Sequence, residues 1–179
     1  QTLPEILNRV EVKPGELYFI PSGTLHAIGA GILLAEIQQN SNTTYRVYDY
    51  GRRGADGKLR PLHIEKALDV TNLSPVLPTT QYPAVQVPGG SVRKLESCRY
   101  FASDVVTVSE EVHFTAEPDS FHHLLVLEGE GTLETPSGSA PLKKGDSVLL
   151  PAGLGQYSVR GSGCRYVLTY AAQPLSEQQ

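Results

Sequence analysis

A histidine that follows a strand-like segment and a tight turn is the residue best placed for chemistry in this chain. The segment is Gly15-Glu-Leu-Tyr-Phe-Ile-Pro-Ser-Gly-Thr-Leu-His26, in which an apolar run leads into a Pro-Ser-Gly turn. A neutral imidazole on such a scaffold is suited to bind a metal ion, because the sheet fixes its direction. A catalytic zinc needs about three protein ligands plus an open position, so His26 alone makes no metal site. The other ligands either lie elsewhere in the chain or are missing from it.

The elements expected to position this histidine are mainly short strands. Segments rich in β-branched and aromatic residues are separated by Gly, Pro, Ser and Asn. The expected strands are Glu16–Ile20, Leu33–Gln38, Tyr45–Tyr50, Val105–Val108, His123–Leu127, Ser147–Leu150 and Tyr166–Tyr170. Helical patterns are expected at Thr2–Asn8 and His63–Val70. The sequence therefore predicts an all-β fold, an antiparallel barrel or sandwich, with one or two short helices.

An internal repeat indicates that this fold occurs in two copies. Residues 12–23 align with residues 142–153 at an offset of 130 residues. The alignment pairs Gly15 with Gly145, Pro21 with Pro151 and Gly23 with Gly153. Glycine supplies a positive φ before the strand, and proline ends the strand where no ladder N–H is needed. Because Gln156 stands at the position of His26, the first copy can bind a metal and the second has lost that ability.

The proline-rich stretch that follows Leu73 separates these two copies. We expect a first unit over residues 1–74, a linker over residues 75–90 and a second unit over residues 91–179.

Composition argues against two classes of partner. The 179 residues carry 15 Lys and Arg against 19 Asp and Glu, a net charge of −4, without a basic stripe for nucleic acid. No apolar run approaches the roughly 20 residues of a membrane span. Cys98 and Cys164 lack a CxxC spacing, and we expect two reduced thiols in a cytoplasmic protein.

The repeated pattern resembles the second motif of the cupin barrels, Gly-Asp/Glu followed by Pro-x-Gly-x-x-His. The second copy is preceded by Phe121-His-His-Leu-Leu-Val-Leu-Glu-Gly-Glu-Gly131, which resembles the closing part of the first cupin motif. That motif normally offers His-x-His and then Glu. Here His122 and His123 are adjacent, and alternation along a strand sends them to opposite faces. We therefore expect a second cupin unit that binds no metal.

Three longer segments resemble the type I phosphomannose isomerases, in particular the short bacterial form. They are Ile20–Gly29, Glu36–Arg52 and Leu62–Val70. The resemblance implies zinc-dependent isomerisation of mannose 6-phosphate to fructose 6-phosphate through an enediol. The family's zinc-binding Gln-x-His and Glu, and a phosphate-contacting lysine, lie upstream of any segment matched here. The chain, which starts at Gln1 and contains no Met, is thus expected to be a C-terminal portion, with an incomplete first cupin, that is inactive alone.

The resemblance also implies roles for single residues. His26 corresponds to the last zinc ligand, and Arg46 to the active-site arginine, which would bind the substrate and stabilise negative charge. Glu36 would line the substrate pocket or support a ligand, or it is a surface carboxylate. Asn42 stands where the family often has an aspartate, so we do not expect the general base at this position.

Alternatives exist for these residues and for the whole chain. Arg46 could be a strand arginine paired with Glu36 or Asp49, and we expect His63 to be a helix cap or a surface group. The chain could instead be a non-catalytic bicupin that binds a sugar or regulates transcription. That alternative accounts for Gln156 but not for Arg46 and its long matching flanks. The expected partner is a small sugar phosphate, and the oligomeric state is left open.

Overall fold

Two units make up the chain, Gln1–Thr79 and Thr80–Gln179. This computed structural model describes residues 2–74 and 78–172. Each unit is described by itself below. No helix within the described residues is long and apolar enough to cross a membrane.

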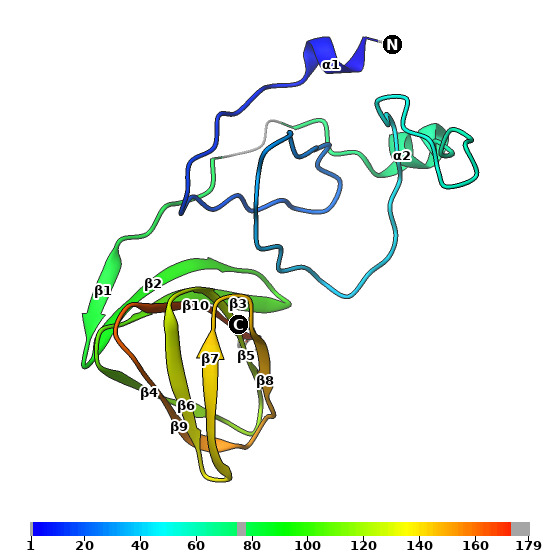
Figure 1. The fold of residues 1–179 in the computed structure, drawn as a ribbon. Coiled ribbons are helices and arrows are strands. Elements are labelled where there is room, and N and C mark those ends of the chain that lie inside the picture. Colours follow the sequence, from blue (N-terminus) through cyan, green and yellow to red (C-terminus); the bar gives the residue numbers. More distant parts are fainter. Residues whose placement is uncertain (1, 75–77, 173–179) are drawn as a thin grey trace, which may run out of the picture. The chain divides into compact units, whose positions relative to one another are not determined.

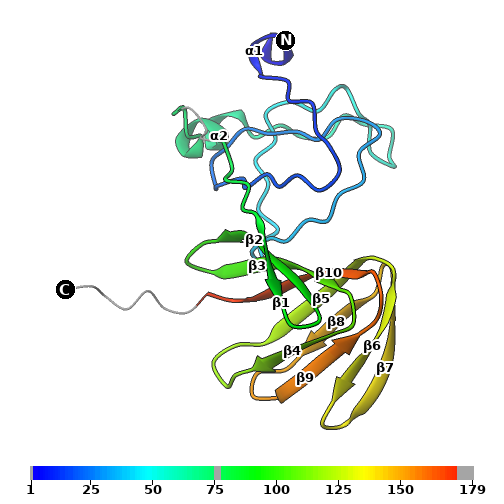
Figure 2. The same ribbon diagram turned by 90° about the vertical axis from the view of Figure 1, so that its left-hand side faces the viewer.

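The second unit is built from two antiparallel sheets that face each other (Figures 1 and 2). Its strands are β1 Ala84–Val87, β2 Gly90–Ser97, β3 Phe101–Val108, β4 Glu111–Ala116, β5 His122–Glu128, β6 Glu130–Thr135, β7 Gly138–Lys143, β8 Ser147–Leu150, β9 Gly155–Arg160 and β10 Cys164–Ala171. The larger sheet has the order β1-β2-β3-β10-β5-β8, and the smaller has the order β4-β9-β6-β7. Every pairing between these strands is antiparallel.

The core of this unit lies between the two sheets, and alternation along the strands fills it. In β10 the side chains of Cys164, Tyr166 and Leu168 face the core, and Tyr166 is fully buried. From the other sheet, Val159 of β9 and Leu133 of β6 pack into the same cluster. Because successive strand residues point to opposite faces, the intervening residues of β10 lie on the other face of the sheet, where Val167 and Thr169 are buried as well.

The sequence predicted four of these strands correctly. Val105–Val108 lies in β3, His123–Leu127 in β5, Ser147–Leu150 matches β8, and Tyr166–Tyr170 lies in β10. The other strands were not predicted. In β7, for example, Pro141 masks the pattern, and it is tolerated because β7, which pairs with β6, is at the edge of its sheet among the described strands.

Residues 84–87, inside the stretch expected to be a linker, form strand β1. Residues 75–77 of that stretch lie outside the described residues. The predicted unit boundaries stay a prediction.

The first unit contains two short helices, as predicted, but not the predicted strands. Helix α1 spans Leu3–Ile6 and α2 spans Ile64–Val70. The predictions of strands at Glu16–Ile20, Leu33–Gln38 and Tyr45–Tyr50 are wrong for this structure, whose described part of the unit holds a single isolated bridge, Arg53 with Leu59. A strand needs a second strand to pair its backbone groups, and among the described residues no strand pairs with these segments; Leu33 is 93% exposed.

The repeated sequence nevertheless folds into the same turns in both units. Gly15 and Gly145 have φ values of 86° and 91°, and Gly23 and Gly153 have 86° and 74°. The backbone N–H of Lys13 donates to Glu16 Oε2 at 2.7 Å, and that of Lys143 donates to Asp146 Oδ2 at 2.8 Å. The N–H groups of Thr24 and Leu154 each donate to the carbonyl three residues earlier, at 3.2 Å. The turns at residues 13–16 and 21–24 thus have the local backbone geometry of the turns at residues 143–146 and 151–154.

Candidate active site

A tight turn after the Tyr45-Arg46-Val-Tyr-Asp49 segment builds the polar centre of the first unit. Tyr50 and Gly51 both have positive φ, 54° and 70°, and the N–H of Arg52 donates to the carbonyl of Asp49 at 2.9 Å. Two positive φ values at the central positions define a type I′ turn, which explains glycine at position 51. The turn folds the Arg52 side chain back over Asp49.

A second loop brings Arg60 to the same carboxylate. The N–H of Gly54 donates to the carbonyl of Lys58 at 2.8 Å, and Arg53 forms its bridge with Leu59. Arg60 therefore returns beside Asp49, although the two residues are eleven apart in sequence.

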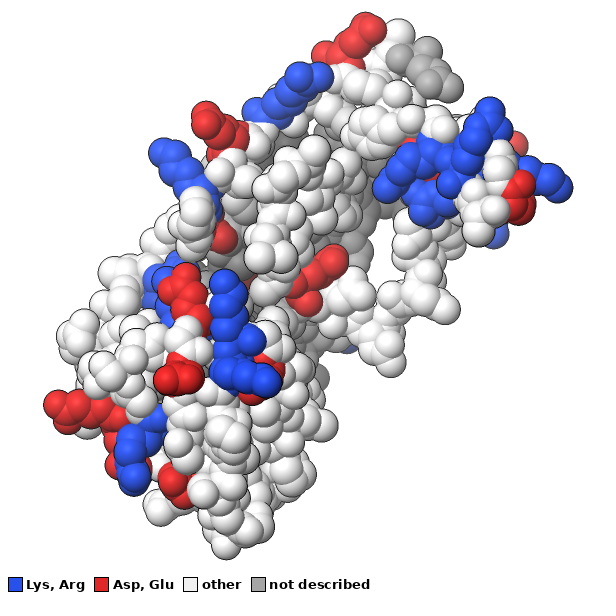
Figure 3. Space-filling model, viewed as in Figure 1, with Lys and Arg blue, Asp and Glu red and all other residues white. Residues whose placement is uncertain are grey.

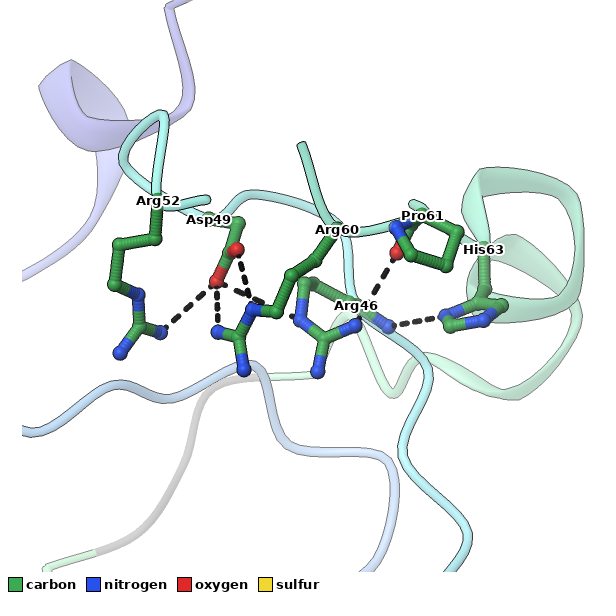
Figure 4. A network of polar contacts seen from close by, with 6 residues as sticks. All are labelled: Arg46, Asp49, Arg52, Arg60, Pro61 and His63. Carbon is green, nitrogen blue, oxygen red and sulfur yellow. Dashed lines mark hydrogen bonds and ion pairs between the residues drawn. The ribbon is translucent and has the colours of Figure 1, made fainter. Parts of the chain in front are cut away.

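Asp49 is the centre of a network of three arginines (Figure 4). Its carboxylate accepts hydrogen bonds from Arg60 Nε at 2.7 Å and from Arg52 Nη2 at 2.9 Å, and Arg60 Nη2 also donates to Oδ1. Arg46 Nε lies 3.5 Å from Oδ1. The hydrogen bond from Arg60 lowers the pKa of Asp49 to about 2, and Arg52 acts in the same direction against the opposing effect of burial. Asp49 is therefore an ionised carboxylate at neutral pH.

Arg46 is held by its backbone as well as by its side chain. Its N–H donates to His63 Nδ1 at 3.1 Å, and the N–H of His63 donates back to the Arg46 carbonyl at 2.8 Å. The guanidinium donates from Nη1 to the carbonyl of Pro61 at 3.2 Å. His63, which precedes helix α2, makes no side-chain capping bond to that helix. It holds Arg46 instead, a role that the sequence did not predict.

The charge around Asp49 is dominated by arginine. One carboxylate offsets one of the three guanidinium charges, so the cluster is suited to an anionic ligand. In Figure 3 blue side chains gather over the part of the first unit that carries α2. Over the second unit in the same view, red and blue side chains are interspersed.

His26 has an exposed imidazole whose tautomer is fixed by the backbone. Its Nδ1 lies 2.9 Å from the carbonyl oxygen of Thr24, which only accepts hydrogen bonds. Nδ1 is therefore the protonated nitrogen, and Nε2 keeps its lone pair for a metal. Among the described residues, no group of three His, Cys, Asp or Glu side chains is arranged to hold a metal ion.

The other residues singled out from the sequence lie outside the arginine network. Glu36 and Asn42 are exposed, and neither forms a hydrogen bond or ion pair with Arg46 among the described residues. The alternative partner for Arg46 that the sequence offered, Asp49, is the one that the structure has. Arg60 is a network member that the sequence did not single out, and His63, expected to be a helix cap or a surface group, binds Arg46. The Tyr-Gly turn was the signal that could have indicated Arg52 over Asp49.

In the second unit the two adjacent histidines lie on opposite faces of β5. His122 Nδ1 is 2.8 Å from the hydroxyl of Tyr157, and His123 Nε2 is 2.8 Å from the hydroxyl of Ser147. Both histidines thus make hydrogen bonds to hydroxyl groups. Gln156, at the position that corresponds to His26, is exposed opposite Thr115.

Two facing antiparallel sheets that carry this repeated Gly-Asp…Pro-x-Gly pattern define the second unit as a cupin. The family model "Mannose-6-phosphate isomerase, cupin domain" matches residues 91–171. A crystal structure of mannose 6-phosphate isomerase from Bacillus subtilis superimposes with a TM-score of 0.65 and 31% identity, covering 73% of this chain and 41% of that one.

Relatives of known sequence agree with this classification. Mannose-6-phosphate isomerase ManA of Bacillus subtilis (strain 168) is 41% identical over 157 residues, which are 88% of this chain and 50% of the relative. Mannose-6-phosphate isomerase of Streptococcus mutans is 36% identical over 147 residues, 82% of this chain and 46% of the relative. The chain belongs to the type I mannose-6-phosphate isomerases and carries their cupin domain. It spans about half the length of the curated relatives it matches.

Proposed function

We propose that this chain is the C-terminal portion of a zinc-dependent isomerase that interconverts mannose 6-phosphate and fructose 6-phosphate. The observation that carries the proposal is the 41% identity to a mannose-6-phosphate isomerase over 88% of the chain. That match leaves so few residues outside it that it must contain His26, Glu36 and Arg46. The chemistry of the Arg46 cluster is consistent with an anionic sugar phosphate as substrate.

The first unit is, in this proposal, the C-terminal part of a separate, metal-binding cupin. The matching turns of residues 12–24 and 142–154 support this assignment. In the second unit β8 follows the turn at residues 143–146 and pairs with β5. The pairing runs from His122 opposite Leu150 to Leu125 opposite Ser147. A counterpart of β5 displaced by the repeat offset would precede Gln1. We propose that a segment before Gln1 supplies the strand that pairs with residues 16–20.

The same segment would complete the zinc site. His26 fits one position of such a site, because its Nδ1–H is bound to the Thr24 carbonyl and Nε2 is exposed. A catalytic zinc takes about three protein ligands, and the described residues offer no such group. We propose that the remaining zinc ligands precede Gln1. Asn42 cannot act as the general base, and we propose that the general base also precedes Gln1.

Within this chain Arg46 is the residue that acts on the substrate. Zinc, when bound, supplies a Lewis acid or a template for the sugar hydroxyl groups. The isomerisation passes through an enediol, so negative charge develops on the oxygen of the former carbonyl. The Arg46 guanidinium donates hydrogen bonds to that oxygen or to the phosphate. Glu36 accepts hydrogen bonds from hydroxyl groups of the sugar.

Replacement of Arg46 in the complete gene product tests the proposal. Arg46→Ala should lower kcat/KM for mannose 6-phosphate by about 100-fold or more, as expected for loss of a charged donor in the transition state. Arg9→Ala, which removes an exposed arginine, is the control and should leave the rate unchanged. A complete product without isomerase turnover would instead favour a passive sugar-binding bicupin.

A further inference from the structure

We propose that Asp49 is a positioning residue that holds the Arg46 guanidinium in its working orientation. The inference deepens the proposed function and rests on it, since it requires Arg46 to act on the substrate.

Asp49 has the burial and the location that such a residue needs. It is 7% exposed, the most buried charged side chain in the described part of the first unit. Its Oδ1 lies 3.5 Å from Arg46 Nε, and the Pro61 carbonyl accepts from Arg46 Nη1 at 3.2 Å. The guanidinium is therefore held at two of its nitrogens, Nε and Nη1. Arg46 Nη2 has no hydrogen bond within the described residues, and its edge is free for a substrate oxygen.

The other two arginines hold the carboxylate rather than compete for the substrate. Arg60 and Arg52 donate hydrogen bonds to Asp49 at 2.7 and 2.9 Å, whereas the Arg46 pair is longer. Asp49 is thus anchored by two hydrogen-bonded partners and attracts Arg46 mainly through its charge. A guanidinium oriented in this way loses less conformational freedom when it binds a phosphate or an oxyanion.

Two hydrogen bonds between Arg46 and His63 hold the Arg46 backbone in place. Arg46 N–H donates to His63 Nδ1, and His63 N–H donates to the Arg46 carbonyl. Loss of the Asp49 charge would therefore release the Arg46 side chain without freeing its backbone. This difference separates positioning from general folding of the loop.

The test measures kcat and KM of the complete isomerase with Asp49→Asn, alone and combined with Arg46→Ala. Misplacement of a catalytic group by about 1 Å can cost about 100-fold, so Asp49→Asn should lower kcat/KM by about 10- to 100-fold. In the Arg46→Ala background it should cause little further loss, because Asp49 acts through Arg46. Asp69→Asn, the same change at an exposed position of α2, is the matched control.

The outcomes are distinguishable. If Asp49→Asn behaves like Asp69→Asn, or lowers kcat/KM by the same factor with and without Arg46, the positioning role is refuted while the isomerase stands. If the wild-type product has no turnover, the proposed function fails first. Should Asp49→Asn not fold, Asp49→Glu keeps the charge and moves the carboxylate by one methylene. A rate equal to wild type in Asp49→Glu would also overturn the proposal, and a loss that depends on Arg46 would support it.

Discussion

Among single residues, His122 is a partly buried titratable group of the second unit, and its surroundings change its pKa. Its ring contacts Tyr157 edge-on at 5.6 Å between centroids and Tyr170 at 5.8 Å. Burial lowers the pKa of His122 and raises that of Tyr157. The tyrosine hydroxyl therefore keeps its proton, and it lies 2.8 Å from His122 Nδ1, to which it can donate when the imidazole is neutral. Protonation of His122 would turn this acceptor into a donor.

This geometry predicts that the second unit loses stability when the pH falls below about 6.5, the ordinary pKa of histidine. Below about pH 6.5 the imidazole binds a proton in the unfolded chain, whereas in the folded chain it binds one only at a lower pH. The free energy of unfolding therefore decreases as the pH is lowered from about 6.5 to the pKa of the folded chain. Burial raises the pKa of Asp104. Protonation of Asp104 therefore favours the folded state, and this group increases the free energy of unfolding on acidification, opposite to His122. Thermal unfolding of the chain between pH 7.5 and 5 measures the effect.

His122→Gln should flatten this pH dependence, whereas His123→Gln, on the opposite face of β5, should leave it unchanged. An unaltered profile in His122→Gln would contradict the assignment.

At the level of elements, the β1–β2 hairpin depends on a glycine that no other residue can replace. Pro88 and Gly89 connect Val87 to Gly90, and Gly89 has φ of 78°. Its carbonyl accepts from the N–H groups of Ser109 and Glu110 at 2.9 and 3.0 Å. A Cβ at Gly89 would lie 1.8 Å from the backbone oxygen of Glu111. The turn thus packs directly against the start of β4.

We predict that Gly89→Ala destabilises the second unit more than Gly145→Ala. Both positions have positive φ, but a Cβ at Gly145 meets nothing within 4 Å. The conformational cost alone is about 1–2 kcal/mol for each alanine, and the collision at Gly89 adds about 1–3 kcal/mol. Urea unfolding of the two variants gives the comparison, and equal free energies of unfolding would refute the close approach.

Local patterns predicted both helices and four strands of the second unit, but not the contacts that depend on partners. The roles of His26, Glu36 and Arg46 stay predictions. Alternation identified β8 and β10, whose neighbours are in the chain, and marked residues 16–20 in the same way. Residues 16–20 form no strand because a strand needs a second strand to pair with. The pattern of one segment does not show whether such a partner is present. The Asp49–Arg60 pair was not predictable, since it depends on two successive loops that return Arg60 across eleven residues.

At the scale of the whole molecule, the proposed function requires an active site assembled from this chain and a segment that precedes it. This chain spans half of its Bacillus subtilis relative, and in the proposal it would supply the His26 imidazole and the Arg46 guanidinium. Its second unit has complete sheets and a closed core, while the extended segments of the first unit expose apolar side chains such as Leu33 and Ile28. Exposed apolar surface of this kind is typical of a segment that packs against a partner.

Zinc binding is the most direct test of this account. The complete gene product should bind one zinc ion tightly, and His26→Ala should abolish that binding, while His113→Ala, on an exposed face of β4, should not. The 179-residue chain by itself should bind zinc only weakly, because one ligand remains. Submicromolar zinc affinity in the isolated chain, or an unchanged affinity in His26→Ala, would contradict a centre shared between this chain and a preceding segment.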